Sequence, residues 1–114
     1  MSSEKELIMY SRSTPCPFVN TVRNALKKLN IPYRELLIDQ DPMYERRVVT
    51  WTGFLSVPTL VIANVGETMP FEEPAYLERG TSPRGIDRGS MLTEPTESEL
   101  TNWLQKHGLL TQVG

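Results

Sequence analysis

The stretch from residue 7 to residue 29 constrains the fold more than any other part of the chain. Residues 7–10, Leu-Ile-Met-Tyr, form a short apolar run, which is typical of a strand buried on both faces of a sheet. From Phe18 to Leu29 apolar residues recur on one helical face, and Pro17 suits the first turn, where its missing N–H costs nothing. We therefore predict a central parallel strand, a helix, and a left-handed stop at Asn30.

The same patterns recur along the chain. We predict strands at 33–38 and 58–63, and a helix that starts at Asp41-Pro42, runs to Thr52 and ends at Gly53. Residues 64–66, Asn-Val-Gly, predict a turn into an antiparallel strand near Glu67. A last helix follows the capping-box sequence at 96–99 and ends at Gly108. The order β-α-β-α-β-β-α predicts an α/β fold of three layers around a mixed four-stranded sheet.

Length and charge narrow the class of protein. The 114 residues predict one domain over 1–114, with a long loop at about 71–92 where periodicity is lost. A formal charge of -2 offers no basic surface for nucleic acid or for a membrane. The N-terminus lacks a signal-peptide pattern, and no run reaches the ~20 apolar residues that a bilayer requires. We expect a cytoplasmic protein with no nucleic-acid or membrane partner.

Cys16, the only cysteine, sits at the strand-to-helix turn. A helix N-terminus favours a thiolate, the reactive form of the side chain, and thiols in such sites have pKa values of about 3.5–7.5. Arg12 adds positive charge, and the turn itself contains no carboxylate. The alternative is that Cys16 is a small buried apolar residue. With one cysteine no internal disulfide can form, so a redox cycle requires a second thiol from outside.

Two motifs resemble those of glutaredoxins. Residues 10–19, Tyr-Ser-Arg-Ser-Thr-Pro-Cys-Pro-Phe-Val, resemble the active-site turn of that family, which carries Cys-Pro-Tyr-Cys. Residues 52–58, Thr-Gly-Phe-Leu-Ser-Val-Pro, resemble its second signature, Thr-Gly-x-x-Thr-Val-Pro, whose proline is cis. The resemblance covers 7–67 and 96–109, and it implies a thioredoxin-like fold, a three-layer α/β/α sandwich. A simple strand-entry turn is the alternative explanation for Val57-Pro58.

The resemblance also implies a function. Glutaredoxins are glutathione-dependent thiol-disulfide oxidoreductases, and Cys16 would be the nucleophile that attacks glutathione mixed disulfides. The backbone of Val57 would pair with the cysteine part of glutathione beside Pro58. The implied partners are glutathione as cosubstrate and glutathionylated or disulfide-bearing proteins. The residues that would bind glutathione are Arg12, Pro17, Phe18, Arg47, Val57 and Pro58.

The sequence departs from the family pattern in three places. Val19 replaces the second cysteine, so the chain resembles a monothiol type that depends on an external thiol. Pro15 inserts one residue and moves Arg12 farther from Cys16. The Gly-Gly pair and the acidic residue that precede the last helix in the family are not clear, and residues 85–90 hold possible remnants.

Two other functions compete with the oxidoreductase. In the first, Cys16 from two chains and two glutathione thiols hold a [2Fe–2S] cluster. Monothiol glutaredoxins that do this usually carry the motif Cys-Gly-Phe-Ser. In this chain Pro17 occupies the position of the glycine in that motif. In the second, the chain is a redox-inactive thioredoxin-like interaction module. We expect no other metal site, and a monomer unless a cluster bridges two chains.

The remaining candidates have structural alternatives. Arg46 and Arg47 could reach the glutathione carboxylate or form a solvated helix face. Trp51 and Trp103 are interpreted as packing residues and His107 as a partner of the last helix dipole. The loop arginines could cover the active-site groove, bind a partner protein or belong to an ordinary insertion; they are Arg79, Arg84 and Arg88.

Overall fold

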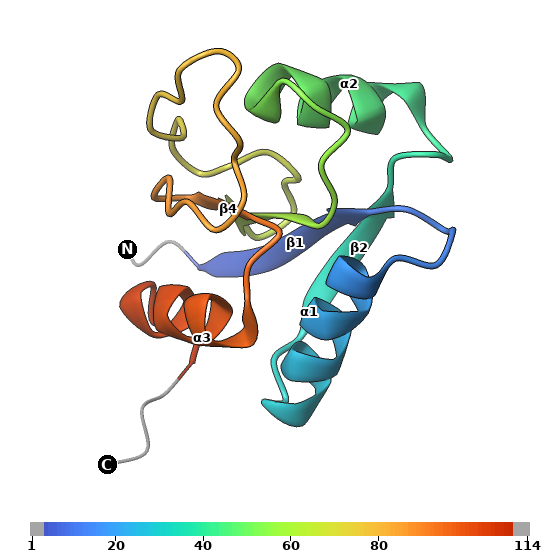
Figure 1. Cartoon of the computed structure of the whole chain (residues 1–114). Coiled ribbons are helices and arrows are strands. Elements are labelled where there is room, and N and C mark those ends of the chain that lie inside the picture. Colours follow the sequence, from blue (N-terminus) through green and yellow to red (C-terminus); the bar gives the residue numbers. More distant parts are fainter. Residues whose placement is uncertain (1–3, 111–114) are drawn as a thin grey trace.

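A four-stranded mixed sheet forms the middle layer of the computed structural model, which describes residues 4–110. The elements are β1 (Lys5–Ser11), α1 (Pro17–Lys28), β2 (Tyr33–Leu37), α2 (Pro42–Thr52), β3 (Thr59–Asn64), β4 (Met91–Thr93) and α3 (Glu97–Lys106). Helices α1 and α3 lie on one side of the sheet and α2 on the other (Figure 1). This arrangement confirms the predicted α/β class and element order.

Strand β1 is the centre of the sheet, whose order is β2-β1-β3-β4. It pairs in parallel with β2 and antiparallel with β3, and β3 pairs antiparallel with β4. Residues 7–10 are at most 1% exposed, as predicted for a strand buried on both faces. The predicted central position of this strand is therefore confirmed.

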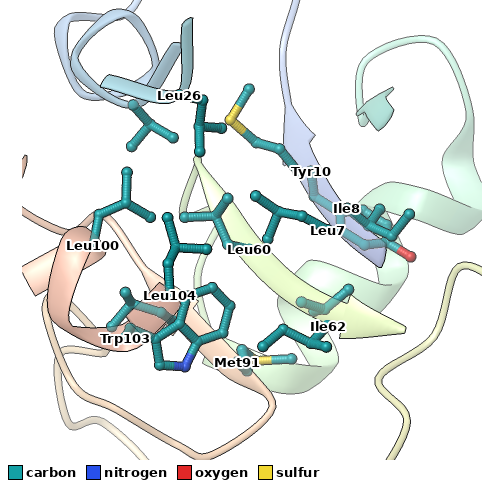
Figure 2. Packing of buried hydrophobic residues seen from close by; sticks show 14 of the residues in the cluster. Leu7, Ile8, Tyr10, Leu26, Leu60, Ile62, Met91, Leu100, Trp103 and Leu104 are labelled. Atoms are coloured by element: carbon teal, nitrogen blue, oxygen red, sulfur yellow. The ribbon is translucent and has the colours of Figure 1, made fainter. Parts of the chain in front are cut away.

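The core lies mainly between the sheet and the pair α1 and α3. Figure 2 shows Leu26, Leu60, Leu100 and Leu104 pointing toward one another, and all four are fully buried. Burying a leucine side chain contributes about 1.5–3 kcal/mol, so this cluster accounts for much of the stability that holds the helices on the sheet. Trp103 closes the cluster, and its indole Nε1 donates to the Gly89 carbonyl at 2.8 Å.

The predicted helix ends are confirmed. Pro17 is the first residue of α1, and Asn30 after it takes a left-handed φ of 57°. Asp41 caps α2 by accepting from the Met43 N–H at 2.9 Å, and Gly53 ends that helix with φ of 80°. Both hydrogen bonds of the capping box between Thr96 and Glu99 are present at the start of α3.

The predicted turn at 64–66 is present, with the Glu67 N–H donating to the Asn64 carbonyl at 2.9 Å, but the antiparallel strand predicted near Glu67 is wrong. The chain leaves β3 at residue 65, and the antiparallel partner β4 begins only at Met91. At Thr68 the carbonyl accepts from the Tyr10 hydroxyl and the side chain accepts from Arg47, so the segment turns toward α2 instead of following β3. Met91 and Leu92, expected in the loop, are buried residues of the edge strand.

The segment 65–90 has no helix or strand, but buried polar contacts hold it against the fold. Arg88 is 8% exposed; its Nε donates to the Ala75 carbonyl at 2.8 Å and its Nη1 to the Trp51 carbonyl at 2.6 Å. Burial lowers the pKa of this guanidinium. The segment therefore lies against the C-terminal end of α2 (Figure 1). No helix within residues 4–110 is long and apolar enough to cross a membrane.

Candidate active site at Cys16

Cys16 is the residue that connects the turn after β1 to α1. It occupies the N-cap position with extended backbone (φ −148°, ψ 121°), and its carbonyl accepts from the Asn20 N–H at 3.0 Å. Its side chain makes no capping hydrogen bond, so the N–H groups of the first turn remain available to stabilise an anionic sulfur. The residue is partly exposed and also contacts the core. It is therefore not the wholly buried apolar residue of the alternative interpretation.

The fold brings a carboxylate to the turn that the turn's own sequence lacks. Asp39, after β2, accepts from the Ser13 N–H at 3.1 Å and from the Ser13 hydroxyl. The Ser13 hydroxyl is the largest cause that holds the pKa of Asp39 below its usual value, and Arg12 adds a smaller electrostatic effect. The turn is thus tied to the end of the neighbouring strand, and its charge is more balanced than the sequence suggested.

A second polar group lies where β1 enters the turn. Glu35 on β2 accepts from the Ser11 hydroxyl and forms a two-point ion pair with Arg23 of α1. Burial opposes the ionisation of Glu35, but the hydrogen bonds from Arg23 and Ser11 outweigh it and lower the pKa of the carboxyl. Sequence reasoning missed this cluster, because Arg23 and Glu35 stand on polar faces with no local signal that they meet.

The segment before β3 lies at the same end of the sheet. Tyr10 pairs with Thr59. The turn that follows Tyr10 and the residues that precede Thr59 therefore lie at the same end of the sheet. The Val57–Pro58 peptide bond is cis. The Pro58 carbonyl accepts from the Glu94 N–H at 2.8 Å, whereas within residues 4–110 the backbone N–H and carbonyl of Val57 make no hydrogen bond. Val57 therefore keeps a free donor and a free acceptor beside the cis bond.

The glutaredoxin family model matches residues 7–66, which are 60 of the 114 residues. The chain belongs to the glutaredoxin family. No curated protein matched the sequence. The matched part contains both motifs of the glutaredoxin resemblance and ends just after β3, so the segment 65–90, β4 and α3 lie almost wholly outside it. The four-stranded mixed sheet with three helices agrees with the thioredoxin-like fold of glutaredoxins.

The first turn of α1 meets an arginine from the long loop. Pro17 and Phe18 are exposed, and the guanidinium of Arg84 lies 4.6 Å from the centre of the Phe18 ring. Arg84 also donates to a Glu94 carboxylate oxygen at 2.8 Å. A groove of about 470 Å³ runs from Phe18 past Arg84 to the start of α3. One of the three loop arginines thus contacts Phe18, which follows Cys16 by two residues in the chain.

The two arginines assigned to glutathione carboxylates differ in their contacts. Arg12 is partly buried, and its Nε is buried without a hydrogen-bond partner in the described part of the chain. Arg47 instead donates to the Tyr10 hydroxyl at 3.0 Å and to the Thr68 hydroxyl at 2.9 Å. The structure therefore leaves more donor capacity on Arg12 than on Arg47.

Val19, Trp51 and His107 all pack against other residues of the fold. Val19, at the position of the second cysteine in the glutaredoxin motif, is 1% exposed and belongs to the core. Trp51 packs edge-on against Tyr10, which agrees with the packing role expected for the tryptophans. His107 is the C-cap of α3, where it lies edge-on against Trp103.

The segment directly before α3 contains no glycine pair. Residues 93–95 lead from β4 into α3, and Glu94 takes a left-handed φ of 45°. The possible remnants at 85–90 lie in the loop instead. Gly85 has a left-handed φ of 72°, which favours glycine, and a Cβ there would lie 2.7 Å from a Glu99 carboxylate oxygen and so would displace that side chain.

Proposed function

We propose that the protein is a monothiol glutaredoxin-type oxidoreductase that uses glutathione to reduce glutathione mixed disulfides through Cys16. The observation that carries this proposal is the position of Cys16 at the N-terminus of α1, at the sheet edge shared with Val57 and its free backbone groups. Such a position combines a stabilised thiolate with a backbone edge that can align an extended peptide.

The reaction proceeds by two exchanges of sulfur partners. The Cys16 thiolate attacks the glutathione sulfur of the mixed disulfide, and the substrate thiol leaves as a thiolate that takes a proton from solvent. A glutathione thiolate then attacks the glutathione sulfur bound to Cys16, which yields oxidised glutathione and regenerates the Cys16 thiolate. Glutathione supplies the two electrons. No internal disulfide takes part, because valine occupies position 19, where the family motif has its second cysteine.

The other proposed contacts with glutathione are backbone hydrogen bonds, ion pairs and apolar contacts. The N–H and carbonyl of Val57 pair with the cysteine unit of glutathione, and Pro58 holds that backbone beside it. Arg12, with its unpartnered Nε, is the first candidate to bind a glutathione carboxylate, and Arg47 is the second. Pro17 and Phe18 supply exposed apolar surface. We place the reaction in a reducing compartment such as the cytoplasm, where a single free thiol persists.

The alternative function is an iron–sulfur cluster scaffold, to which this chain would contribute a single thiolate. Within the described residues no three His, Cys, Asp or Glu side chains are grouped so as to hold a metal ion. A [2Fe–2S] cluster would require thiolates from a second chain and from glutathione, and Cys16 is the residue that this chain would contribute. No step of the proposed reaction passes through such a cluster.

Mass spectrometry with oxidised glutathione tests the chemistry directly. We expect one glutathione adduct on the wild-type protein and none on Cys16→Ser. In a coupled assay with a glutathione mixed disulfide, wild-type turnover should disappear in the same variant. A wild-type protein that forms neither the adduct nor any product would overturn the proposal, whereas a coloured dimer after anaerobic reconstitution would favour the cluster.

A further inference from the structure

One side of α1 connects Cys16 to a charged residue two turns away. Cys16, Asn20 and Arg23 are spaced by four and three residues, so they lie along one side of the helix. Long side chains in helices lean toward the N-terminus, and the Arg23 Nη1 accordingly lies 3.5 Å from Asn20 Oδ1. The guanidinium is thus displaced from its own Cα toward the cysteine.

Glu35 fixes this guanidinium in place. Arg23 Nε donates to Glu35 Oε1 at 3.1 Å, and Nη2 donates to Glu35 Oε2, which also accepts from Ser11. Two parallel bonds restrict the arginine to one orientation. The side chains of Arg23 and Glu35 are 37% and 22% exposed, so water screens the pair only in part. Since Ser11 is the last residue of β1, the cation is held where the turn to Cys16 begins.

Electrostatics link the cation to the sulfur. The pKa of Arg23 is raised first by the hydrogen bond to Glu35, with further contributions from negative charge on Tyr33 and on the Cys16 thiolate. The pKa of Glu35, by contrast, is governed by burial, Arg23 and Ser11. The sulfur therefore acts electrostatically on the cationic member of the pair, with which it shares one side of α1.

We propose that Arg23 is a positioning residue for the reaction at Cys16: Glu35 holds its guanidinium along α1 so that its positive charge favours the ionised sulfur. The inference rests on the proposed function in taking Cys16 as the nucleophile.

Most other charged groups around the turn have partners of their own, whereas Arg12, in the turn itself, has no hydrogen-bond partner among the described residues and interacts only electrostatically with Asp39. Asp39 is bonded to Ser13 and lies near Arg12, Arg84 is paired with Glu94, and Arg47 of α2 is bonded to Tyr10 and Thr68. At the far end of α1, Lys28 is paired with Glu97 of α3. Arg23 is distinguished from these groups because it shares one side of α1 with the cysteine.

The pH dependence of alkylation tests the proposal without glutathione. Cys16 is the only cysteine, so the rate with iodoacetamide across a pH series reports its ionisation alone. In Arg23→Gln we expect the midpoint to rise by about half to one pH unit, which slows alkylation below the midpoint about three- to tenfold. Arg23→Lys keeps the charge and should recover part of this loss.

Two further variants separate electrostatics from loss of structure. Glu35→Gln removes negative charge but keeps an acceptor, so the midpoint should move down, opposite to Arg23→Gln. Arg34→Gln is the matched control, because Arg34 forms a comparable pair with Glu6 near the start of β1, whereas Cys16 follows its end; its midpoint should equal that of the wild type.

Three results would overturn the inference. They are an unchanged midpoint in folded Arg23→Gln, an equal rise in Arg34→Gln, or a rise in Glu35→Gln, which would indicate that the turn is merely loosened. Failure of the proposed function is distinguishable, since it would appear as no glutathione adduct while the alkylation profiles keep their predicted order.

Discussion

Two regions of this protein keep their shape by different means. The framework, defined as residues 7–64, places its apolar residues in strands and helices that bury one another, and most of its polar backbone groups pair within those elements. The segment 65–90 has no helix or strand and is held by scattered hydrogen bonds, several of them from arginine, tryptophan and tyrosine side chains to backbone carbonyls. Loss of one apolar contact should therefore weaken the whole fold, whereas loss of one polar contact should loosen the segment locally.

The largest effect is expected for Leu60→Ala in the framework. Leu60 is 0% exposed in the cluster between the sheet and the helices, and its truncation leaves a cavity that costs about 2–5 kcal/mol of unfolding free energy. Chemical denaturation measures this loss. The matched control is Leu55→Ala, because Leu55 is 51% exposed and its truncation should change stability by less than about 0.5 kcal/mol. Equal losses in the two variants would contradict the distinction.

Arg88→Met tests the segment 65–90. The change keeps an apolar stem but removes the donors to the Ala75 and Trp51 carbonyls, which should cost about 1–2 kcal/mol. Hydrogen exchange should accelerate at the amides of 65–90 more than at those of β1. Arg79→Met provides the control, since Arg79 is exposed. Acceleration spread evenly over the protein would show that the segment and the framework open together.

Glu35→Gln tests the ion pair between Glu35 and Arg23 inside the framework. The folded pKa of Glu35 lies below its usual value of 4.5, so the ionised carboxyl stabilises the protein above that pH, and the contribution is lost as pH falls through the folded pKa. At pH 7 the variant should be less stable by about 1 kcal/mol, and the difference should shrink in acid. Thermal unfolding at several pH values measures it, with the exposed Glu73→Gln as control; a difference independent of pH would contradict this account.

The smallest effect is expected where the two regions touch at the site. Arg84→Gln removes the contact over the Phe18 ring and the exposed pair with Glu94, which together contribute about 0.5–1 kcal/mol. Exchange of the amides near residue 84 should accelerate while the amides of β1 are unaffected. Arg79→Gln serves as the control, and a larger loss of stability than in Arg88→Met would reverse the expected order.

These regions also differ in how far the sequence predicts them. The start of α1 at Pro17, the stop at Asn30, the end of α2 at Gly53 and the capping box at Thr96 depend on neighbouring residues, and all were predicted. The edge strand was misplaced although the predicted turn after Asn64 forms, because distant contacts, those of Thr68 and of the apolar residues of β4, decide which segment pairs with β3.

Dependence on distant contacts also explains which residues of the site sequence reasoning missed. Cys16 and the Val57-Pro58 pair stand in motifs, so their residue types identify them. Asp39, Arg23 and Glu35 are ordinary polar residues until the sheet brings β2 beside the turn. Charge balance around a nucleophile is a property of the assembled strands, which the local pattern of residues does not contain.

Ile62 has a consequence for how this protein can change its length. Its carbonyl accepts from the Phe71 N–H and its N–H donates to the Ser90 carbonyl, so the segment 65–90 departs and returns at one point of β3. Because the two ends of such a segment meet at one residue of the sheet, a change of length inside the segment does not have to move either end. Each doubling of such a loop costs only about 0.6 kcal/mol in closure entropy. Insertions at exposed positions between these two bonds, such as residues 79–80, should therefore leave unchanged the β1–β3 register that places the Cys16 turn and Val57 at the same end of the sheet.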